Sequence, residues 1–204
     1  MSTMRIAVFV SGGGTNLQAI LEKEQAGLLK GEVALVVGSK ENIYALERAK
    51  NFNKKSIVLR KKDFTSQEVY EKELIKILES EKIDFIVLAG FLTILSPYFI
   101  QAYEKRIINV HPSLIPSFCG EGMYGLKVHE AALQKGVKVS GATVHYVNEI
   151  PDGGEIILQK AVEVKEGDTP EILQKRIMEE AEWVLLPEAI NIVCERLEKE
   201  KENG

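Results

Sequence analysis

Short apolar runs rich in β-branched residues alternate with helical patterns along the first half of the chain, and this alternation restricts the fold most. Continuous apolar runs of this kind are typical of strands that are buried on both faces of a sheet. The predicted strands are residues 5–10, 33–38, 56–59, 84–88 and 107–110. The predicted helices are residues 17–26, 44–50 and 66–78, and a short helix that Ser96 caps and Pro97 opens. This β-α-β-α order predicts an α/β fold with a doubly wound, mainly parallel sheet and helices on both faces.

The last third of the chain has a different pattern. Residues 139–147 and 156–164 alternate more clearly between apolar and polar side chains, and they flank a Pro-Asp-Gly-Gly turn at residues 151–154. Alternation with a period of two indicates strands with one exposed face. We therefore expect an antiparallel extension of the sheet near the C-terminus, with at least one antiparallel pairing.

A long helix is predicted for the C-terminal segment. Thr169 is the expected cap and Pro170 the first helical residue. Pro187 is expected to bend or break this helix, because proline lacks the backbone N–H that the helix needs. The charged residues 198–204 are expected to fray.

Length, composition and charge narrow the class of protein. The chain has 204 residues, 45% of them hydrophobic, which suits a single domain spanning residues 1–204. A net charge of −4 disfavours a general nucleic-acid or membrane binder. There is no apolar run of membrane-spanning length and no signal-peptide pattern. Two distant cysteines, Cys119 and Cys194, are typical of a reducing compartment, so we expect a cytoplasmic protein.

A glycine-rich loop, Ser-Gly-Gly-Gly-Thr-Asn at residues 11–16, follows the first predicted strand and precedes a helix. Backbone amides at a helix start favour an anion, most often phosphate, and Thr15 and Asn16 can add side-chain donors. The loop lacks the Gly-Lys-Ser/Thr of a Walker A motif, and Leu17 replaces the last glycine of a dinucleotide fingerprint. We predict a monophosphate site that includes Gly14, although the same loop can be a strand–helix turn with no ligand.

Asn109 and His111 end the fifth predicted strand, where ligands bind in open α/β sheets. Being two residues apart, they share one face of the strand. An amide can stabilise an oxyanion, and an imidazole can move a proton between two amines, as acyl transfer requires. Asp152 in the Pro-Asp-Gly-Gly turn is a candidate partner that would orient His111 and favour its charged form.

Simpler explanations exist for each of these residues. His111 can merely cap a strand, and Asp152 can be ordinary turn chemistry. His145 is expected to be structural or to support the site from behind, and His129 to be structural or at the surface. No Ser or Cys stands in an obvious nucleophile motif and the histidines lack metal spacing, so direct transfer without a metal is expected.

Several segments together resemble the phosphoribosylglycinamide formyltransferase family, over residues 5 to about 196. The matching segments are VSGGGTNLQAI (10–20), VLAGFLTILSP (87–97), INVHPSLIPSF (108–118), GLKVHEAAL (125–133), SGATVHYV (140–147), PDGGEIILQ (151–159) and EWVLLPEAI (182–190). Their joint occurrence in this order is highly specific. The resemblance implies the formyltransferase fold, with the ribonucleotide phosphate bound in the N-terminal half and the C-terminal half contributing to the folate site.

The resemblance also implies roles for individual residues. Asn109, His111 and Asp152 match the catalytic trio, and Asn109 also contacts the folate. Gly14, Thr15 and Asn16 match the loop that binds the ribonucleotide phosphate, and Glu182 matches an acid that contacts the ribonucleotide. The folate-binding residues implied are Leu92, Thr93, Ile94, Leu95, Asn148, Glu149, Ile150, Pro151 and Asp152.

The implied reaction transfers the formyl group of 10-formyltetrahydrofolate to the amine of glycinamide ribonucleotide in purine synthesis, in a protein that is a monomer or a homodimer. Asn109 and protonated His111 would stabilise the tetrahedral oxyanion. Asp152 would orient His111, with a water relaying protons to the folate nitrogen. No metal, nucleic acid or membrane is implied.

The sequence departs from the family pattern at four places. Thr93 and Gln67 stand where many relatives have arginine, which puts the contacts to the folate glutamate tail in doubt. Trp183 stands where histidine is common, and the loop at residues 117–124 is several residues longer than usual. None of these departures affects the catalytic trio.

Other functions remain open at this point. Methionyl-tRNA formyltransferases share the HPSLLP-like segment but usually carry a further C-terminal domain. Formyltetrahydrofolate deformylases share much of the core and transfer the formyl group to water. A noncatalytic nucleotide-binding or flavodoxin-like domain would explain the glycine loop, but not Asn109, His111 and Asp152 together. A redox role for Cys119 is disfavoured, because no second cysteine lies near it in sequence.

Overall fold

The structure is a computed structural model that describes residues 3–203. Its centre is one seven-stranded sheet with the strand order β3-β2-β1-β4-β5-β6-β7. The strands are β1 (Met4–Val10), β2 (Gly31–Gly38), β3 (Ser56–Val58), β4 (Phe85–Leu88), β5 (Ile107–His111), β6 (Val139–Tyr146) and β7 (Ile156–Glu163). The first five strands run parallel, and β6 and β7 extend the sheet in antiparallel pairing. The predicted parallel sheet and its antiparallel extension are both confirmed.

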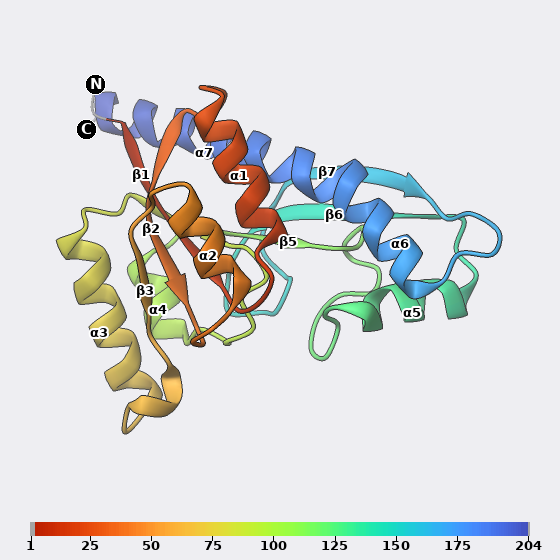
Figure 1. The fold of residues 1–204 in the computed structure, drawn as a ribbon, viewed down its shortest axis with the longest axis horizontal. Helices are drawn as coiled ribbons and strands as arrows, with labels where there is room; N and C mark the ends of the chain where they lie inside the picture. The colour runs from red at the N-terminus through yellow and green to blue at the C-terminus, as the bar shows by residue number, and fades with distance from the viewer. Residues whose placement is uncertain (1–2, 204) are drawn as a thin grey trace.

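The helices join the strands and lie on both sides of the sheet (Figure 1). They are α1 (Thr15–Gln25), α2 (Tyr44–Asn51), α3 (Gln67–Ser80), α4 (Pro97–Ala102), α5 (Leu126–Lys135), α6 (Pro170–Ile177) and α7 (Trp183–Asn203). A short 3₁₀ turn, η1 (Lys61–Asp63), precedes α3. The expected cap of α4 is present, because the Ser96 hydroxyl accepts the Phe99 amide and Pro97 opens the helix.

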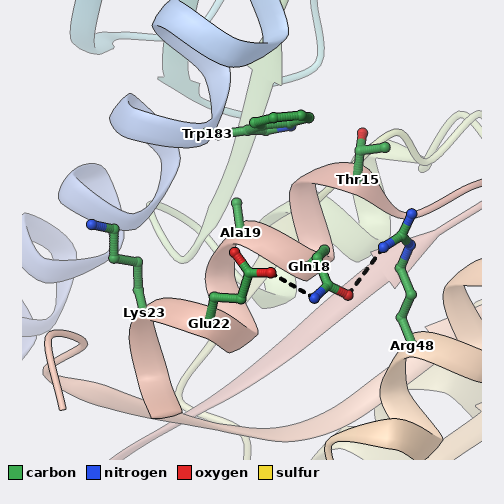
Figure 2. A pocket seen from close by; sticks show the side chains of 7 residues that line it. All are labelled: Thr15, Gln18, Ala19, Glu22, Lys23, Arg48 and Trp183. Carbon is green, nitrogen blue, oxygen red and sulfur yellow. Dashed lines mark hydrogen bonds between the residues drawn. The ribbon is translucent and has the colours of Figure 1, made fainter. Parts of the chain in front are cut away.

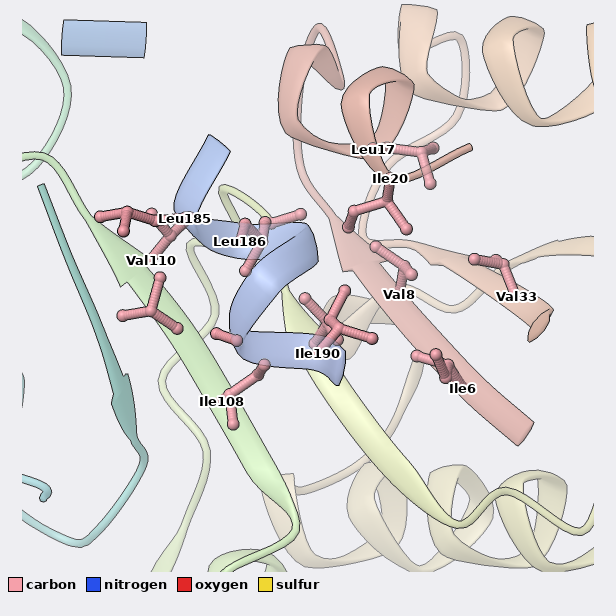
Figure 3. Packing of buried hydrophobic residues seen from close by; sticks show 14 of the residues in the cluster. Ile6, Val8, Leu17, Ile20, Val33, Ile108, Val110, Leu185, Leu186 and Ile190 are labelled. Carbon is pink, nitrogen blue, oxygen red and sulfur yellow. The ribbon is translucent and has the colours of Figure 1, made fainter. Parts of the chain in front are cut away.

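Two apolar cores hold the helices against the sheet. On one face, Ile6 and Val8 of β1 pack with residues of α1 and α7, including Leu17 and Ile190 (Figure 3). On the other face, Phe9 of β1 belongs to a second buried cluster with residues of α3 and α4. Neighbouring residues of β1 thus face opposite cores, as the side-chain period of a strand requires. Burial on both faces explains why the first strands appear in the sequence as continuous apolar runs.

The C-terminal helix is interrupted earlier than the sequence predicts. The chain is helical from Pro170 onward, but residues Met178–Glu182 form a π turn between α6 and α7. Pro187 lies inside α7 without ending it, so of the bend or break expected at Pro187 the break is wrong, and the bend stays a prediction. A π turn takes up a mismatch in the hydrogen-bond ladder, and such turns are frequent at functional sites.

The charged tail is helical rather than frayed. Helix α7 continues to Asn203, while Gly204 lies outside the described residues. The Lys201 ammonium lies 2.7 Å from the Asp84 carboxylate, and Arg196 pairs with Glu200 one turn away. The Lys201–Asp84 pair ties the last turn to the body of the protein, which the charge pattern alone does not reveal. Among residues 3–203, no helix is both long and apolar enough to cross a bilayer.

Candidate active site

A cleft of about 300 Å³ opens at the carboxyl ends of β1, β4 and β5. Its lining includes Thr15 and Asn16 together with Asn109, His111 and Asp152. This is the place where ligands enter open parallel sheets. Residues that are up to 167 positions apart, from Thr15 to Glu182, therefore meet in one cavity, as the sequence prediction requires.

The glycine loop adopts a conformation that depends on glycine at one position. Gly14 precedes α1 with φ of 71°, in the left-handed region. A Cβ there would lie 2.6 Å from the Cβ of Ala45, whereas nothing lies within 4 Å of a Cβ placed at Gly12 or Gly13. The loop therefore packs against α2 at Gly14 and leaves open space beside the two preceding glycines. The first-turn amides of α1 have no partner within the helix and are available to an anion at Thr15 and Asn16.

Glu182 joins the start of α1 to the π turn. Its carboxylate accepts a 2.7 Å hydrogen bond from the Asn16 side-chain amide, and both side chains are buried in the wall of the cleft. Burial raises the pKa of Glu182, and the bond from Asn16 opposes that rise. The cleft thus contains a carboxyl group beside the predicted phosphate loop, where it can accept hydrogen bonds from a polyhydroxylated ligand.

His111 and Asp152 are in contact, as predicted. The Nδ1 atom of His111 lies 3.4 Å from a carboxylate oxygen of Asp152, and the His111 ring is almost completely buried. The other ring nitrogen, Nε2, lies 2.9 Å from the carbonyl oxygen of Phe118. Both nitrogens therefore face oxygen acceptors, so the charged ring is the form that can donate a hydrogen bond on both sides.

Burial outweighs the effect of the carboxylate on this ring. It lowers the pKa of His111 below its ordinary value, although Asp152 and the Phe118 carbonyl raise it. Asp152 does favour the charged form of His111, as expected. The larger effect of burial nevertheless makes the net shift of the His111 pKa a lowering. A ring that starts neutral, and whose charged form already has two acceptors, is suited to gain and release a proton during a reaction.

His145 connects Asn109 to Asp152. Asn109 and His145 are directly opposite each other in the antiparallel pair of β5 and β6. The His145 Nε2 atom lies 3.2 Å from Asn109 Nδ2 and 3.5 Å from Asp152 Oδ1, while its Nδ1 lies 2.8 Å from the Tyr146 carbonyl oxygen. His145 does not line the cleft and supports the group from behind, in agreement with the sequence analysis.

The Pro-Asp-Gly-Gly turn directs Asp152 toward both histidines. Asp152 has a positive φ of 55°, and a Cβ at Gly154 would lie 1.7 Å from the Tyr146 carbonyl oxygen. The turn therefore needs glycine at position 154 to approach β6 so closely. Burial raises the pKa of Asp152, but contacts with His145, the Gly120 amide and His111 bring it below its ordinary value. Asp152 is thus held as a carboxylate at neutral pH.

The loop at residues 117–124 supplies contacts that the sequence analysis missed. The Phe118 carbonyl oxygen faces His111, and the Gly120 amide donates a 2.9 Å hydrogen bond to Asp152. Both are backbone groups, so no residue type in the loop predicts them. Met123 and Tyr124 also line the cleft. Cys119 lies in the same loop, where burial and Asp152 raise its thiol pKa, which disfavours a reactive thiolate.

The residues predicted for the folate do not all line this cleft. Leu92 does, Thr93 lines a neighbouring cavity, Leu95 is buried in the core, and Ile94 is 73% exposed. Asn148 and Glu149 border another cavity of about 420 Å³, next to α4. Ile150 is exposed, and Pro151 lies with it in the turn that precedes Gly153. The two predicted folate segments thus flank the cleft, and Leu92 and Asp152 are the members that enter it.

A separate cavity of about 360 Å³ lies along α1. Figure 2 shows Trp183 beside α1, with the Gln18 amide hydrogen-bonded to Glu22 and Arg48 at 2.7 and 3.0 Å. Thr15 borders both cavities, but Asn109, His111 and Asp152 are absent from this one. The 300 Å³ cleft is therefore the candidate active site.

His129 is buried rather than at the surface. It lies in α5 with no exposed area, and neither ring nitrogen has a hydrogen-bond partner among residues 3–203. Burial lowers its pKa to about 4, with a smaller effect from the charge of His111. We interpret His129 as a structural residue that stays neutral near neutral pH.

Comparisons with known proteins agree with this fold and site. The family model described as formyl transferase matches residues 4–190. The chain is 41% identical over 201 residues to the chloroplastic phosphoribosylglycinamide formyltransferase of Arabidopsis thaliana, covering 98% of this chain and 68% of that protein. It is 37% identical to the Escherichia coli K12 phosphoribosylglycinamide formyltransferase, covering 98% of this chain and 92% of that protein.

A solved structure gives the same result. The crystal structure of glycinamide ribonucleotide transformylase 1 from Symbiobacterium toebii superposes with a TM-score of 0.88 at 40% identity, covering 95% of this chain and 88% of that one. The fold and the site therefore define a formyl transferase, and the chain belongs to that family. Within it, the chain belongs with the phosphoribosylglycinamide formyltransferases, and none of these relatives is named as a deformylase.

Proposed function

We propose that the cleft binds glycinamide ribonucleotide and 10-formyltetrahydrofolate together and transfers the formyl group to the glycinamide amine. The reaction would serve purine biosynthesis and yield formylglycinamide ribonucleotide and tetrahydrofolate. The observation that supports this function best is the meeting of Asn109, His111 and Asp152 in one cavity with Thr15 and Asn16. An amide donor, a proton carrier and an anion site are the groups that this transfer needs.

The glycine loop is the proposed phosphate end of the cleft. The backbone amides at Thr15 and Asn16, after Gly14, would bind the ribonucleotide phosphate. Glu182 would accept hydrogen bonds from the hydroxyl groups of the ribonucleotide, since it is bound to Asn16 in the same wall. The glycine loop and the catalytic trio would then hold the two ends of one substrate, which reduces the entropy cost of aligning its amine.

The trio is the proposed chemical end. As the amine nitrogen bonds to the formyl carbon, the carbonyl oxygen becomes an oxyanion that the Asn109 amide stabilises. His111 starts neutral, takes the proton that the amine loses, and in its charged form also donates to the oxyanion. The bond between the formyl carbon and the folate nitrogen then breaks, and the proton passes to that nitrogen, directly or through water. Each good oxyanion donor contributes about 3 kcal/mol.

For this chemistry, one ring nitrogen of His111 must leave its present hydrogen-bond partner and turn to the substrate. In the structure its Nε2 faces the Phe118 carbonyl and its Nδ1 faces Asp152. Asp152 keeps the ring oriented from one side, so the Nε2 side is the one that would turn to substrate when the loop at residues 117–124 moves. We infer that substrate binding displaces the Phe118 carbonyl from His111.

The folate would lie beside Leu92 and the turn that carries Asp152, with residues 92–95 and 148–152 forming the two walls of its site. Both segments flank the cleft that holds the trio. We further propose that residues 1–204 act as one formyltransferase domain, in which β1 and α1 provide the phosphate loop and the C-terminal half contributes the folate loop and Glu182. The cytoplasmic location expected from the sequence stays a prediction.

An assay with and without the acceptor tests this function. The purified protein is mixed with 10-formyltetrahydrofolate, and tetrahydrofolate and formylglycinamide ribonucleotide are measured. We expect both products in equal amounts, and only when glycinamide ribonucleotide is present. Release of formate and tetrahydrofolate without the ribonucleotide would instead identify a deformylase-like hydrolase.

A further inference from the structure

The cavity of about 360 Å³ along α1 takes no part in the proposed reaction, yet it borders the phosphate loop. Its walls come from one side of α1, from Arg48 of α2 and from Trp183 at the start of α7. The α1 residues follow the helical repeat and therefore share one side of the helix; they are Thr15, Gln18, Ala19, Glu22 and Lys23. A cavity of this size is at the lower end of the range for small-molecule sites.

Two consecutive residues beside the π turn line different cavities. Glu182 is buried and lines the candidate active site, whereas Trp183 is partly exposed and lines the α1 cavity. The Trp183 Nε1 atom is buried and has no hydrogen-bond partner among residues 3–203. Figure 2 shows the indole above Ala19, the smallest side chain on this side of α1. The accessible part of Trp183 is therefore its apolar ring, with open space next to it.

Arg48 and Lys23 bring positive charge to this cavity. The Arg48 guanidinium donates to the Gly13 carbonyl oxygen at 2.8 Å and to the Gln18 side chain at 3.0 Å, and both acceptors are neutral. Within the part of the chain that the structure describes, no ion pair joins Arg48 or Lys23 to a carboxylate. The carboxylate of Glu22 accepts the Gln18 amide at 2.7 Å. An anion at the start of α1 would thus have an uncompensated guanidinium nearby.

Thr15 connects the cavity to the phosphate loop. It is the first residue of α1, and it lines both this cavity and the candidate active site. A phosphate held at the start of α1 therefore leaves two directions open to the rest of its molecule. One direction enters the cleft toward Asn109 and His111, as proposed for glycinamide ribonucleotide. The other follows α1 toward Trp183.

We propose that the α1 cavity binds the base of a purine nucleoside monophosphate, whose phosphate occupies the glycine loop in place of the substrate phosphate. The inference rests on the proposed function, because the glycine loop must be a phosphate site. The base stacks on the indole of Trp183, and a two-ring base covers more of that ring than a one-ring base does. Because one loop cannot hold two phosphates, the nucleotide inhibits transfer in competition with glycinamide ribonucleotide and not with the folate.

The fluorescence of Trp183 tests the proposal without turnover, because Trp183 is the only tryptophan of the chain. The purified protein is titrated with adenosine monophosphate (AMP), uridine monophosphate and ribose 5-phosphate. We expect AMP to quench the fluorescence and to bind about tenfold more tightly than ribose 5-phosphate, since a stacked base contributes a factor of this order. Absence of quenching, or equal affinities for AMP and ribose 5-phosphate, would overturn the proposal. Equal affinities for AMP and uridine monophosphate would overturn the assignment to a purine.

A leucine variant identifies the stacking residue. Trp183→Leu keeps an apolar side chain but removes the ring, so calorimetry should show its AMP affinity reduced about tenfold, to that of ribose 5-phosphate. Its KM for glycinamide ribonucleotide should stay near the wild-type value. The matched control is Tyr98→Leu, at an exposed aromatic residue of α4 outside the cavity, which should keep the AMP affinity. An unchanged AMP affinity in Trp183→Leu would show that the base does not bind here.

Inhibition kinetics separate this inference from the proposed function. At saturating 10-formyltetrahydrofolate, AMP should raise the KM for glycinamide ribonucleotide and leave kcat unchanged. Inhibition that is relieved by folate instead would contradict the shared phosphate site. If transfer occurs but AMP neither quenches nor inhibits, the inference alone fails. If AMP quenches but no transfer occurs, the proposed function fails and the nucleotide site remains.

Discussion

The side-chain amide of Asn16 donates a 2.7 Å hydrogen bond to the carboxylate of Glu182, which lies 166 residues further along the chain. This bond joins the first turn of α1 to the π turn that separates α6 from α7. The interruption of the C-terminal helix therefore lies where the helix borders the cleft. A wider turn at this point places a carboxyl group beside the phosphate loop.

The buried carboxyl group of Glu182 leads to a prediction about stability. Because burial raises its pKa in the folded protein, the folded state holds the proton more tightly than the unfolded state. The contribution of Glu182 to the free energy of unfolding is fully present below the ordinary glutamate pKa. It is lost as the pH rises through the raised pKa of the folded state. Glu182→Gln should remove this loss, as measured by urea unfolding from pH 4 to 8. Its KM for the ribonucleotide should rise while that for the folate changes little.

The exposed Glu188 in α7, the helix that follows the π turn, provides the control for that measurement. Glu188→Gln should leave both the pH dependence of unfolding and the KM for the ribonucleotide as they are in the wild type. If Glu182→Gln showed the wild-type pH dependence, the assignment of a buried, titrating carboxyl group to the cleft wall would be wrong.

Gly14 and Gly13 form a matched pair for the phosphate loop. Gly14→Ala puts a Cβ 2.6 Å from Ala45 in a left-handed residue, which we expect to cost about 1–2 kcal/mol or more of unfolding free energy. It should also raise the KM for the ribonucleotide. Gly13→Ala meets nothing within 4 Å and should unfold like the wild type. Equal stabilities of the two variants would contradict the loop geometry.

His129 should make the protein sensitive to acid. Its folded pKa of about 4 lies below the ordinary histidine value of 6.5, so the unfolded state takes up a proton first as pH falls. Stability is therefore full above pH 6.5 and declines toward pH 4 by up to about 1.4 kcal/mol for each pH unit. His129→Leu should reduce this decline in urea unfolding. A variant with the full wild-type decline would show that another group is responsible.

The state of His111 should appear in the pH dependence of transfer. Because its pKa is lowered and the ring must start neutral to take the amine proton, the rate at saturating substrate should fall only at pH values below the ordinary histidine pKa. His129→Leu should keep this limb, since His129 lies outside the cleft. A rate that increases on acidification through the same range would mean that the ring must begin the reaction charged.

The sequence predicts the parallel part of the fold because burial on both faces requires continuous apolar strands, such as the one at residues 107–110. It also predicts that Asn109 and His111 face the same ligand, since strand periodicity fixes that direction. The contact between Asp152 and His111 follows from the resemblance rather than from spacing, because it depends on how the turn at residues 151–154 folds back.

Other features depend on information that residue types do not carry. The Phe118 carbonyl and the Gly120 amide are backbone groups, present at almost every position. His145 lies beside Asn109 only in one register of β5 against β6. Other registers differ from it by a shift of a few residues, and the sequence pattern does not choose among them. The π turn at Met178–Glu182 has no sequence signal that separates it from an α-helix, and Pro187 suggested an interruption in the wrong turn.

Transfer of a ¹³C-labelled formyl group by the wild type and by Asp152→Asn tests the central claim most directly. We expect the wild-type protein to place the label on the amine of glycinamide ribonucleotide. Asp152→Asn should bind both substrates and transfer almost no label, as His111→Ala should too. Near-normal transfer by Asp152→Asn, with the label reaching the amine at the wild-type rate, would contradict the account.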